Sequence, residues 1–288
     1  MDIVVFDSLA WILFFSIFAG ILGLLIGSFL NVVVYRVPNG LSIVSPPSAC
    51  PNCGASIRSF DNIPVISWFV LRGKCRDCAE PISARYPIVE AATGLFFAGV
   101  IVWRWQALEP AINSLSAPTL IGSILETVAY LYLAAISVAL FLIDLDTRRL
   151  PNAIVLPSYA VGIVLLGASA ILTGSYSNLL TAGIGMAALF LFYFILVLIR
   201  PGGMGFGDVK LAGVLGLHLG WLGIGPLVVG AFAAFLLGGI FSVALLLVRK
   251  ANRTSAIPFG PWMLIGAWVG IIFGNDISAG YLALVGLS

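Results

Sequence analysis

The residues best suited to chemistry are two aspartates that border long apolar runs. Asp208 lies in the stretch Pro201–Lys210, PGGMGFGDVK, between apolar runs at 179–199 and 209–219, and Asp144 closes a different apolar run. The four glycines of this stretch permit backbone angles that a membrane helix avoids, and they let another chain approach closely. Irregular backbone and a carboxylate are both costly near a bilayer, so their coincidence indicates a functional site.

Asp144 and Asp208 are expected at the same depth, because successive membrane spans alternate in direction and both acids fall at the same face. Two carboxylates a few ångströms apart cannot easily both ionise, so such a pair shares one proton over part of the pH range. One member would activate a water molecule, while the other would donate a proton to a carbonyl oxygen. The sequence predicts this arrangement but does not show lateral proximity or assign the two roles.

Simpler interpretations of the acids remain open. Asp144 or Asp146 could pair with Arg148 or Arg149 at a helix end, where an exposed ion pair contributes little. We favour that pairing for Asp146 and a site role for Asp144. Asp208 could instead be only the N-cap of the helix that follows it.

Two other titratable residues need an interpretation. His218 is the sole histidine and is expected to be structural, which leaves no plausible Ser-His-Asp or Cys-His arrangement. Glu90 lies at a membrane edge close to Arg85, so pairing and function are equally open for it.

Four cysteines form two CxxC pairs in the polar segment 35–86: Cys50, Cys53, Cys75 and Cys78. Paired CxxC turns at this separation are typical of tetrahedral zinc, because each turn supplies two thiolates. A redox CxxC and unliganded thiols are the alternatives. Zinc would also explain how a segment with few large apolar side chains folds. The prolines at 46, 47, 51, 64 and 81 predict turns and short strands.

The elements that must position these residues are membrane helices. The chain is 61% hydrophobic and 9% charged, with a mean hydropathy of +1.13, whereas a soluble domain carries about 25% charged residues. We therefore predict an α-helical polytopic membrane protein of about eight transmembrane helices with a small cytoplasmic zinc-binding insertion. The expected spans are 9–34, 87–105, 120–142, 153–173, 179–199, 209–224, 226–248 and 259–275.

Charge distribution predicts the orientation. With the N-terminus outside, 13 of the 14 basic residues fall in cytoplasmic segments and only Arg104 lies outside. The expected domains are a first transmembrane helix at 1–34, a cytoplasmic zinc-binding domain at 35–86 and a transmembrane aspartic peptidase core at 87–288. The shortest span, 209–224, is the least secure of the eight.

These motifs resemble those of the type IV prepilin peptidases, membrane aspartic proteases marked by GxGD. That motif is Gly205-Phe-Gly207-Asp208-Val-Lys210 here, and its partner runs from Asp144 to Pro151-Asn152. Further matching stretches, typical of the long bifunctional bacterial branch, are Gly27–Val32, Asp61–Pro64, Ser67-Trp68, Leu71–Gly73, Ile82-Ser83 and Arg85–Pro87 with Glu90. The resemblance covers nearly the whole chain.

The resemblance implies a concrete activity. Such enzymes cleave the basic leader of prepilins and pseudopilins after a glycine, at the cytoplasmic face of the bacterial inner membrane, and then N-methylate the new amino terminus with S-adenosylmethionine. It implies that Asp144 and Asp208 are the catalytic pair, that Gly205, Gly207, Lys210 and Pro151 support them, and that no nucleic acid is a partner. A peptidase without methyl transfer, a proton-coupled transporter and a zinc-bearing scaffold are the alternatives.

Overall fold

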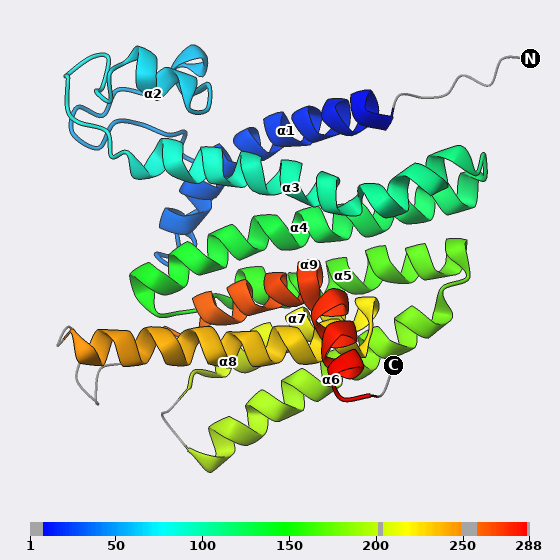
Figure 1. Cartoon of the computed structure of the whole chain (residues 1–288). Helices are drawn as coiled ribbons and strands as arrows, with labels where there is room; N and C mark the ends of the chain where they lie inside the picture. The colour runs from blue at the N-terminus through cyan, green and yellow to red at the C-terminus, as the bar shows by residue number, and fades with distance from the viewer. Residues whose placement is uncertain (1–7, 201–203, 249–257, 287–288) are drawn as a thin grey trace, which may run out of the picture. The chain divides into compact units, whose positions relative to one another are not determined.

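The computed structural model describes residues 8–200, 204–248 and 258–286, and every named element in these ranges is a helix (Figure 1). The predicted turn Pro201–Lys210 is thus described only from Met204 onward, and Gly202 and Gly203 lie outside the described residues. The elements are α1 (Ser8–Arg36), η1 (Ser59–Asn62), α2 (Ile66–Val70), α3 (Arg85–Asn113), α4 (Ala117–Thr147), α5 (Asn152–Thr173), α6 (Tyr176–Ile199), α7 (Phe206–Leu222), α8 (Ile224–Leu247) and α9 (Gly260–Leu284).

Among the described residues, seven helices are long and apolar enough to cross a membrane: α1, α3, α4, α5, α6, α8 and α9. The predicted class, a polytopic α-helical membrane protein with a small cysteine-bearing insertion, is confirmed. The remaining predicted span corresponds to α7, whose 17 residues cover about 25 Å, less than the ~30 Å hydrocarbon core. Glycines flank this helix on both sides, at Gly205 and Gly223, and limit its length. Membrane crossing by α7 stays a prediction.

The chain divides into two compact units, and α4 contributes residues to both. The first comprises residues 1–116 and 130–139, and the second comprises 117–129 and 140–288. In the first unit, α1 and α3 lie side by side (Figure 1). Glycines on α1 make this possible, because a Cβ at Gly23 would lie 2.7 Å from the Thr93 carbonyl oxygen and one at Gly27 would lie 2.7 Å from Glu90 Cα. Small residues at helix contacts are the usual means of close packing in membranes.

In the second unit α7 is the central helix, and it is buried along nearly its whole length from Val209 to Trp221. It packs closely on α6, where a Cβ at Gly185 would lie 2.5 Å from the Gly216 carbonyl oxygen. α8 and α9 form a second close pair, with Gly270 packed against Gly230. The first turn of α7 is therefore joined to a buried helix, while Gly205 and Phe206 are themselves exposed and Asp208 is half-buried.

The segment between α1 and α3 differs in part from its prediction. Its regular structure consists of two isolated β-bridges, Ala49–Ser56 and Lys74–Pro81, together with the short helices η1 and α2. Turns and short strands were expected, and in this described segment the β-structure is limited to these isolated bridges. The cysteine turns set the backbone here, and each turn closes after a single bridge.

Candidate functional sites: a carboxylate pair and a cysteine cluster

Asp144 lies in the last turn of α4, and its exposed fraction is 4%. The helix ends three residues later, where Arg148 adopts a left-handed backbone with φ of 54°. Asp144 Oδ2 accepts a hydrogen bond of 3.1 Å from the backbone N–H of Gly260, the first residue of α9. A buried carboxylate without a donor would be costly, so this contact between residues far apart in sequence stabilises its position.

Asp208 is the third residue of α7 and is half-buried. Its Oδ2 accepts the N–H of Gly205 at 3.0 Å, while its own N–H donates to the Gly205 carbonyl oxygen at 3.1 Å. The N-cap interpretation of Asp208 is therefore wrong in position, because Gly205 is the N-cap and the carboxylate reaches back to it from the third helical residue. Both aspartates are thus held through Oδ2 by a backbone N–H at a helix N-terminus.

The structure brings the two aspartates together. Asp144 interacts electrostatically with Asp208. Leu150 lies in the connection between α4 and α5 and is close to a neighbour of each aspartate. A Cβ at Gly207, which precedes Asp208, would be 3.0 Å from Leu150 Cβ. A Cβ at Gly260, which binds Asp144, would be 3.4 Å from Leu150 Cδ2. The lateral proximity that the sequence left open is present in this unit.

Aromatic residues that the sequence analysis missed complete the surroundings of the pair. Tyr193 is buried on α6 and interacts electrostatically with Asp208. Its ring centroid lies 6.2 Å from that of Phe259 and 5.5 Å from that of Phe235. No local pattern distinguishes Tyr193 from other aromatic residues of an apolar run. Gly260 was missed for a similar reason, because its partner is 116 residues away.

The supporting motif residues fix the starts of α5 and α7. Pro151 is the N-cap of α5, one residue before the N1 position at which proline is most common. Lys210 Nζ donates to Asn152 Oδ1 at 2.9 Å and lies 4.9 Å from the Phe206 ring centroid. The Tyr159 hydroxyl donates to the Lys210 carbonyl oxygen at 2.6 Å. Two helix N-termini, one of which carries Asp208, are therefore tied together.

Three further candidate residues are Asp146, His218 and Glu90. Asp146 is exposed, and its pairing with an arginine stays a prediction. His218 is fully buried in α7, about 15 Å along the helix from Asp208, with Nδ1 2.9 Å from the Val214 carbonyl oxygen. Glu90 Oε2 accepts the N–H of Val65 at 2.7 Å, which ties the insertion to α3 and favours pairing with backbone over pairing with an arginine.

The four cysteines form a cluster whose geometry suits a tetrahedral metal. Their Sγ atoms all lie within 4.8 Å of one another, and Cys50 Sγ and Cys78 Sγ are 3.8 Å apart. Four thiolates at the usual Zn–S distance of about 2.3 Å would be about 3.8 Å apart. None of the four is in a disulfide. The expected clustering is confirmed, and the donor set fits zinc.

Two equivalent turns present these thiolates. Cys50 N–H donates to the Ala55 carbonyl oxygen, and Cys75 N–H donates to the Glu80 carbonyl oxygen, 25 positions further along. The same offset relates the bridge Ala49–Ser56 to Lys74–Pro81. In each turn, the residue that follows the second cysteine has a positive φ: Gly54 in the first turn and Ala79 in the second. The segments 48–57 and 73–82 therefore have the same turn structure, and their cysteine Sγ atoms lie close to one another.

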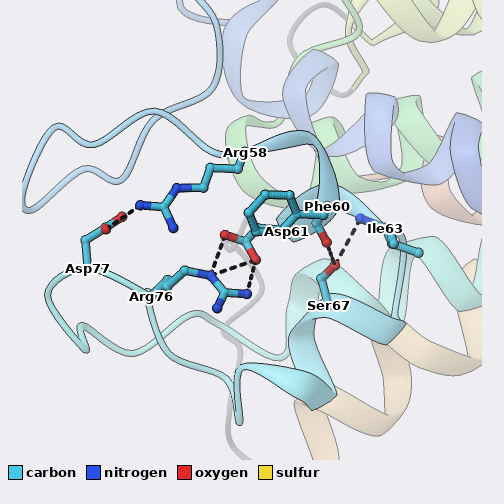
Figure 2. Close-up of polar contacts among 7 residues, drawn as sticks. All are labelled: Arg58, Phe60, Asp61, Ile63, Ser67, Arg76 and Asp77. Carbon is cyan, nitrogen blue, oxygen red and sulfur yellow. Dashed lines mark hydrogen bonds and ion pairs between the residues drawn. The ribbon is translucent and has the colours of Figure 1, made fainter.

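Ion pairs join the two turns to the rest of the insertion (Figure 2). Arg76 Nε donates to Asp61 Oδ2 at 2.9 Å, and Arg58 pairs with Asp77 at 3.0 Å. The Arg76 guanidinium holds the pKa of Asp61 below its ordinary value, because it hydrogen-bonds the carboxylate. Ser67 on α2 holds the end of η1 in place: its hydroxyl donates to the Phe60 carbonyl oxygen and accepts the Ile63 N–H.

Taken together, the fold and its sites define a multi-pass helical membrane protein with a carboxylate pair and a four-cysteine cluster. Residues 21–105 match the family model described as Bacterial Peptidase A24 N-terminal domain, and residues 131–243 match the Type IV leader peptidase family. The chain belongs to the prepilin leader peptidase/N-methyltransferase family.

Similar curated proteins carry that name over nearly their full length. A Prepilin leader peptidase/N-methyltransferase of Pseudomonas putida is 35% identical over 298 residues, which cover 95% of this chain and 96% of the relative. The protein of the same name from Stutzerimonas stutzeri is 33% identical over 93% of this chain and 94% of its own. Among solved structures, no significant match was found.

Proposed function

We propose that this protein cleaves the leader peptide of prepilins and pseudopilins after a glycine and N-methylates the new amino terminus, with Asp144 and Asp208 as the catalytic pair. The observation that carries the proposal is the arrangement of these two acids. They come from α4 and α7, interact with each other, and are each held through Oδ2 by a backbone N–H. Membership of the family supplies the reaction.

The two carboxylates divide the hydrolysis between them. The ionised member takes a proton from water, and that water attacks the carbonyl carbon of the scissile peptide bond. The protonated member donates to the carbonyl oxygen as negative charge develops there. Since Oδ2 of each acid is held by backbone, Oδ1 is the atom that we assign to water and to the substrate carbonyl. The resulting tetrahedral intermediate collapses when the acid that took the proton from water passes it to the leaving amine, while the other acid recovers its proton from the intermediate's hydroxyl group.

The location of the pair suits a substrate that is itself a membrane helix. Both acids lie at helix ends, Asp144 in the last turn of α4 and Asp208 in the first turn of α7. Gly205 and Gly207 flank Asp208 without side chains, so an extended substrate backbone could approach the carboxylate. The charge distribution favours the cytoplasmic side of the inner membrane for these ends, with the N-terminus outside.

We assign the cysteine cluster to structural zinc, held by Cys50, Cys53, Cys75 and Cys78. Zinc bound by four thiolates has no open position, so it supplies folding energy to the insertion and no chemistry. We propose S-adenosylmethionine as the methyl donor, and the methyltransferase part of the relatives' names supports the need for such a donor. We propose the 35–86 insertion with the adjoining helix ends as its binding region, without assigning a base.

The test of the function is product mass. Purified protein in detergent is incubated with a prepilin, with and without S-adenosylmethionine, beside Asp144→Asn and Asp208→Asn. Wild type should remove the leader and add one methyl group only when the donor is present. Each variant should lose cleavage by about 10²–10⁴-fold, the range for an acid–base group. Cleavage without methylation would show that the protein is a peptidase without methyltransferase activity. Variants that cleave at the wild-type rate would contradict the assignment of Asp144 and Asp208 as the catalytic pair.

A further inference from the structure

We propose that Gly260 is a positioning residue of the peptidase site, and that its missing side chain is what lets the carboxylate of Asp144 lie against the N-terminus of α9. The proposal rests on the proposed function for its catalytic consequence. The contact itself is independent of that function, because it is a feature of the fold.

The first support is the hydrogen bond between the two residues. The Gly260 N–H is one of the donors at the start of α9 that no carbonyl of the same helix can satisfy. It donates to Asp144 Oδ2 at 3.1 Å, and both residues are buried. A helix N-terminus favours a negative charge, and a hydrogen bond to a charged acceptor is stronger than a neutral one. The start of α9 therefore sets both the place and the orientation of this carboxylate.

The second support is the space at Gly260. A Cβ there would lie 2.6 Å from Asp144 Oδ2 and 3.3 Å from Asp144 Cγ, while the next neighbour, Leu150 Cδ2, would be at an ordinary 3.4 Å. Gly260 is not among the described residues with a positive φ, so its backbone would accept an alanine. An alanine at this position would therefore push the Asp144 carboxylate out of its place against the start of α9, because that carboxylate is the end of a side chain and can shift.

The third support is the anchoring of the residue before it. Phe259 packs its ring 5.2 Å from that of Phe235 on α8 and 6.2 Å from that of Tyr193 on α6. Pro261 follows Gly260 in the first turn and fixes the backbone there. The Gly260 N–H is thus held from both sides, and Asp144 cannot move without losing it.

The kinetic test compares Gly260→Ala with Gly280→Ala. Gly280 lies on the same helix, and a Cβ there would meet nothing within 4 Å, so this control makes the same substitution without the contact. Gly260→Ala should lower kcat for leader cleavage by roughly 10²-fold, the effect of a displacement of about 1 Å, with KM little changed. Methylation of a pilin whose leader is already removed should match that of Gly280→Ala.

A double-mutant cycle on Tm tests the contact without any activity. Gly260→Ala should lower Tm in the wild-type background. In the Asp144→Ala background the clash is gone, and Tm should stay the same or rise because alanine favours a helix more than glycine does. A single variant that fails to fold, while the double variant folds, would report the same coupling.

The proposal is overturned if Gly260→Ala cleaves with the kcat of Gly280→Ala, or if it lowers Tm equally in both backgrounds. Wild-type protein that cleaves no prepilin would instead refute the proposed function, and the Tm cycle would still decide whether Gly260 and Asp144 are in contact. The two failures are therefore distinguishable.

Discussion

At the scale of single residues, the site depends on polar atoms that belong to backbone as much as to side chains. The N–H groups of Gly205 and Gly260 each hold an aspartate oxygen, and Lys210 holds Asn152. Sequence reasoning finds the aspartates because a carboxylate beside an apolar run is unusual. It does not find Gly260 or Tyr193, because a glycine and a tyrosine within apolar runs are common.

The contact between Lys210 and Asn152 makes a prediction at this scale. Lys210→Met removes the 2.9 Å hydrogen bond that ties α7 to α5, and we expect a lower Tm and slower leader cleavage. Asn152→Ala should do the same, and the double variant should lose less than the sum, with a coupling of about 0.5–3 kcal/mol from Tm. Strictly additive effects would show that the two side chains do not act together.

At the scale of elements, the cysteine insertion and the helix pairs are stabilised by different physics. The helices α1 and α3 approach because glycines remove side chains from the contact, and the insertion folds around two copies of one cysteine turn. The insertion buries few large apolar side chains: Ile57, Phe60, Ile63, Ile66, Phe69 and Val70 are all exposed. We therefore expect the stability of the insertion to come from a metal bound by its four cysteines and from the ion pairs around it.

Removal of the metal is the corresponding prediction. Cys78→Ser, or a chelator strong enough to compete with four thiolates, should release about one zinc per chain and open residues 37–84 to proteolysis. Methylation should fall further than leader cleavage, since the methyl donor is proposed to bind the insertion. As a control, Asp144→Asn should keep its zinc and its protease resistance. The measurement is the zinc content of each purified protein. Wild-type protein with no bound zinc would contradict the assignment.

At the scale of the whole molecule, the open question is how many times the chain crosses the membrane. Seven described helices are long enough, and α7 is shorter but lies at the centre of its unit. A helix of 17 residues spans about 25 Å, which a bilayer can match by local thinning at a modest cost. The charge distribution supports eight crossings, because seven would place basic segments on both faces.

Reporter fusions test this topology. Alkaline phosphatase fused after Gly174 or after Gly223 should be active, because eight spans place both connections outside the cytoplasm, whereas a fusion after Arg149 should be inactive. An inactive fusion after Gly223 beside an active one after Gly174 would show that α7 does not cross. The fusion after Arg149 is the control, since it lies in the connection that carries two arginines.

The sequence by itself determined the helices and the clustering of the cysteines, and it singled out the two acids as candidates. These follow from local rules: in lipid every backbone polar group must be bonded within a helix, so apolar runs become helices, and two CxxC turns bring four thiolates into reach of one another. One wrong expectation was local as well, the short strands in the insertion, and the alternative of an N-cap at Asp208 was wrong in position.

Only the tertiary structure decided that the two acids meet and what holds them. Leu150 lies between Gly207 and Gly260, and the Gly260 N–H reaches Asp144 across 116 residues. Membrane helices give no pattern for such contacts, since lipid is as apolar as a neighbouring helix and packing alone selects the partner. The depth of each acid can therefore be predicted from the length of its span, whereas its neighbours follow from where glycines let the helices approach.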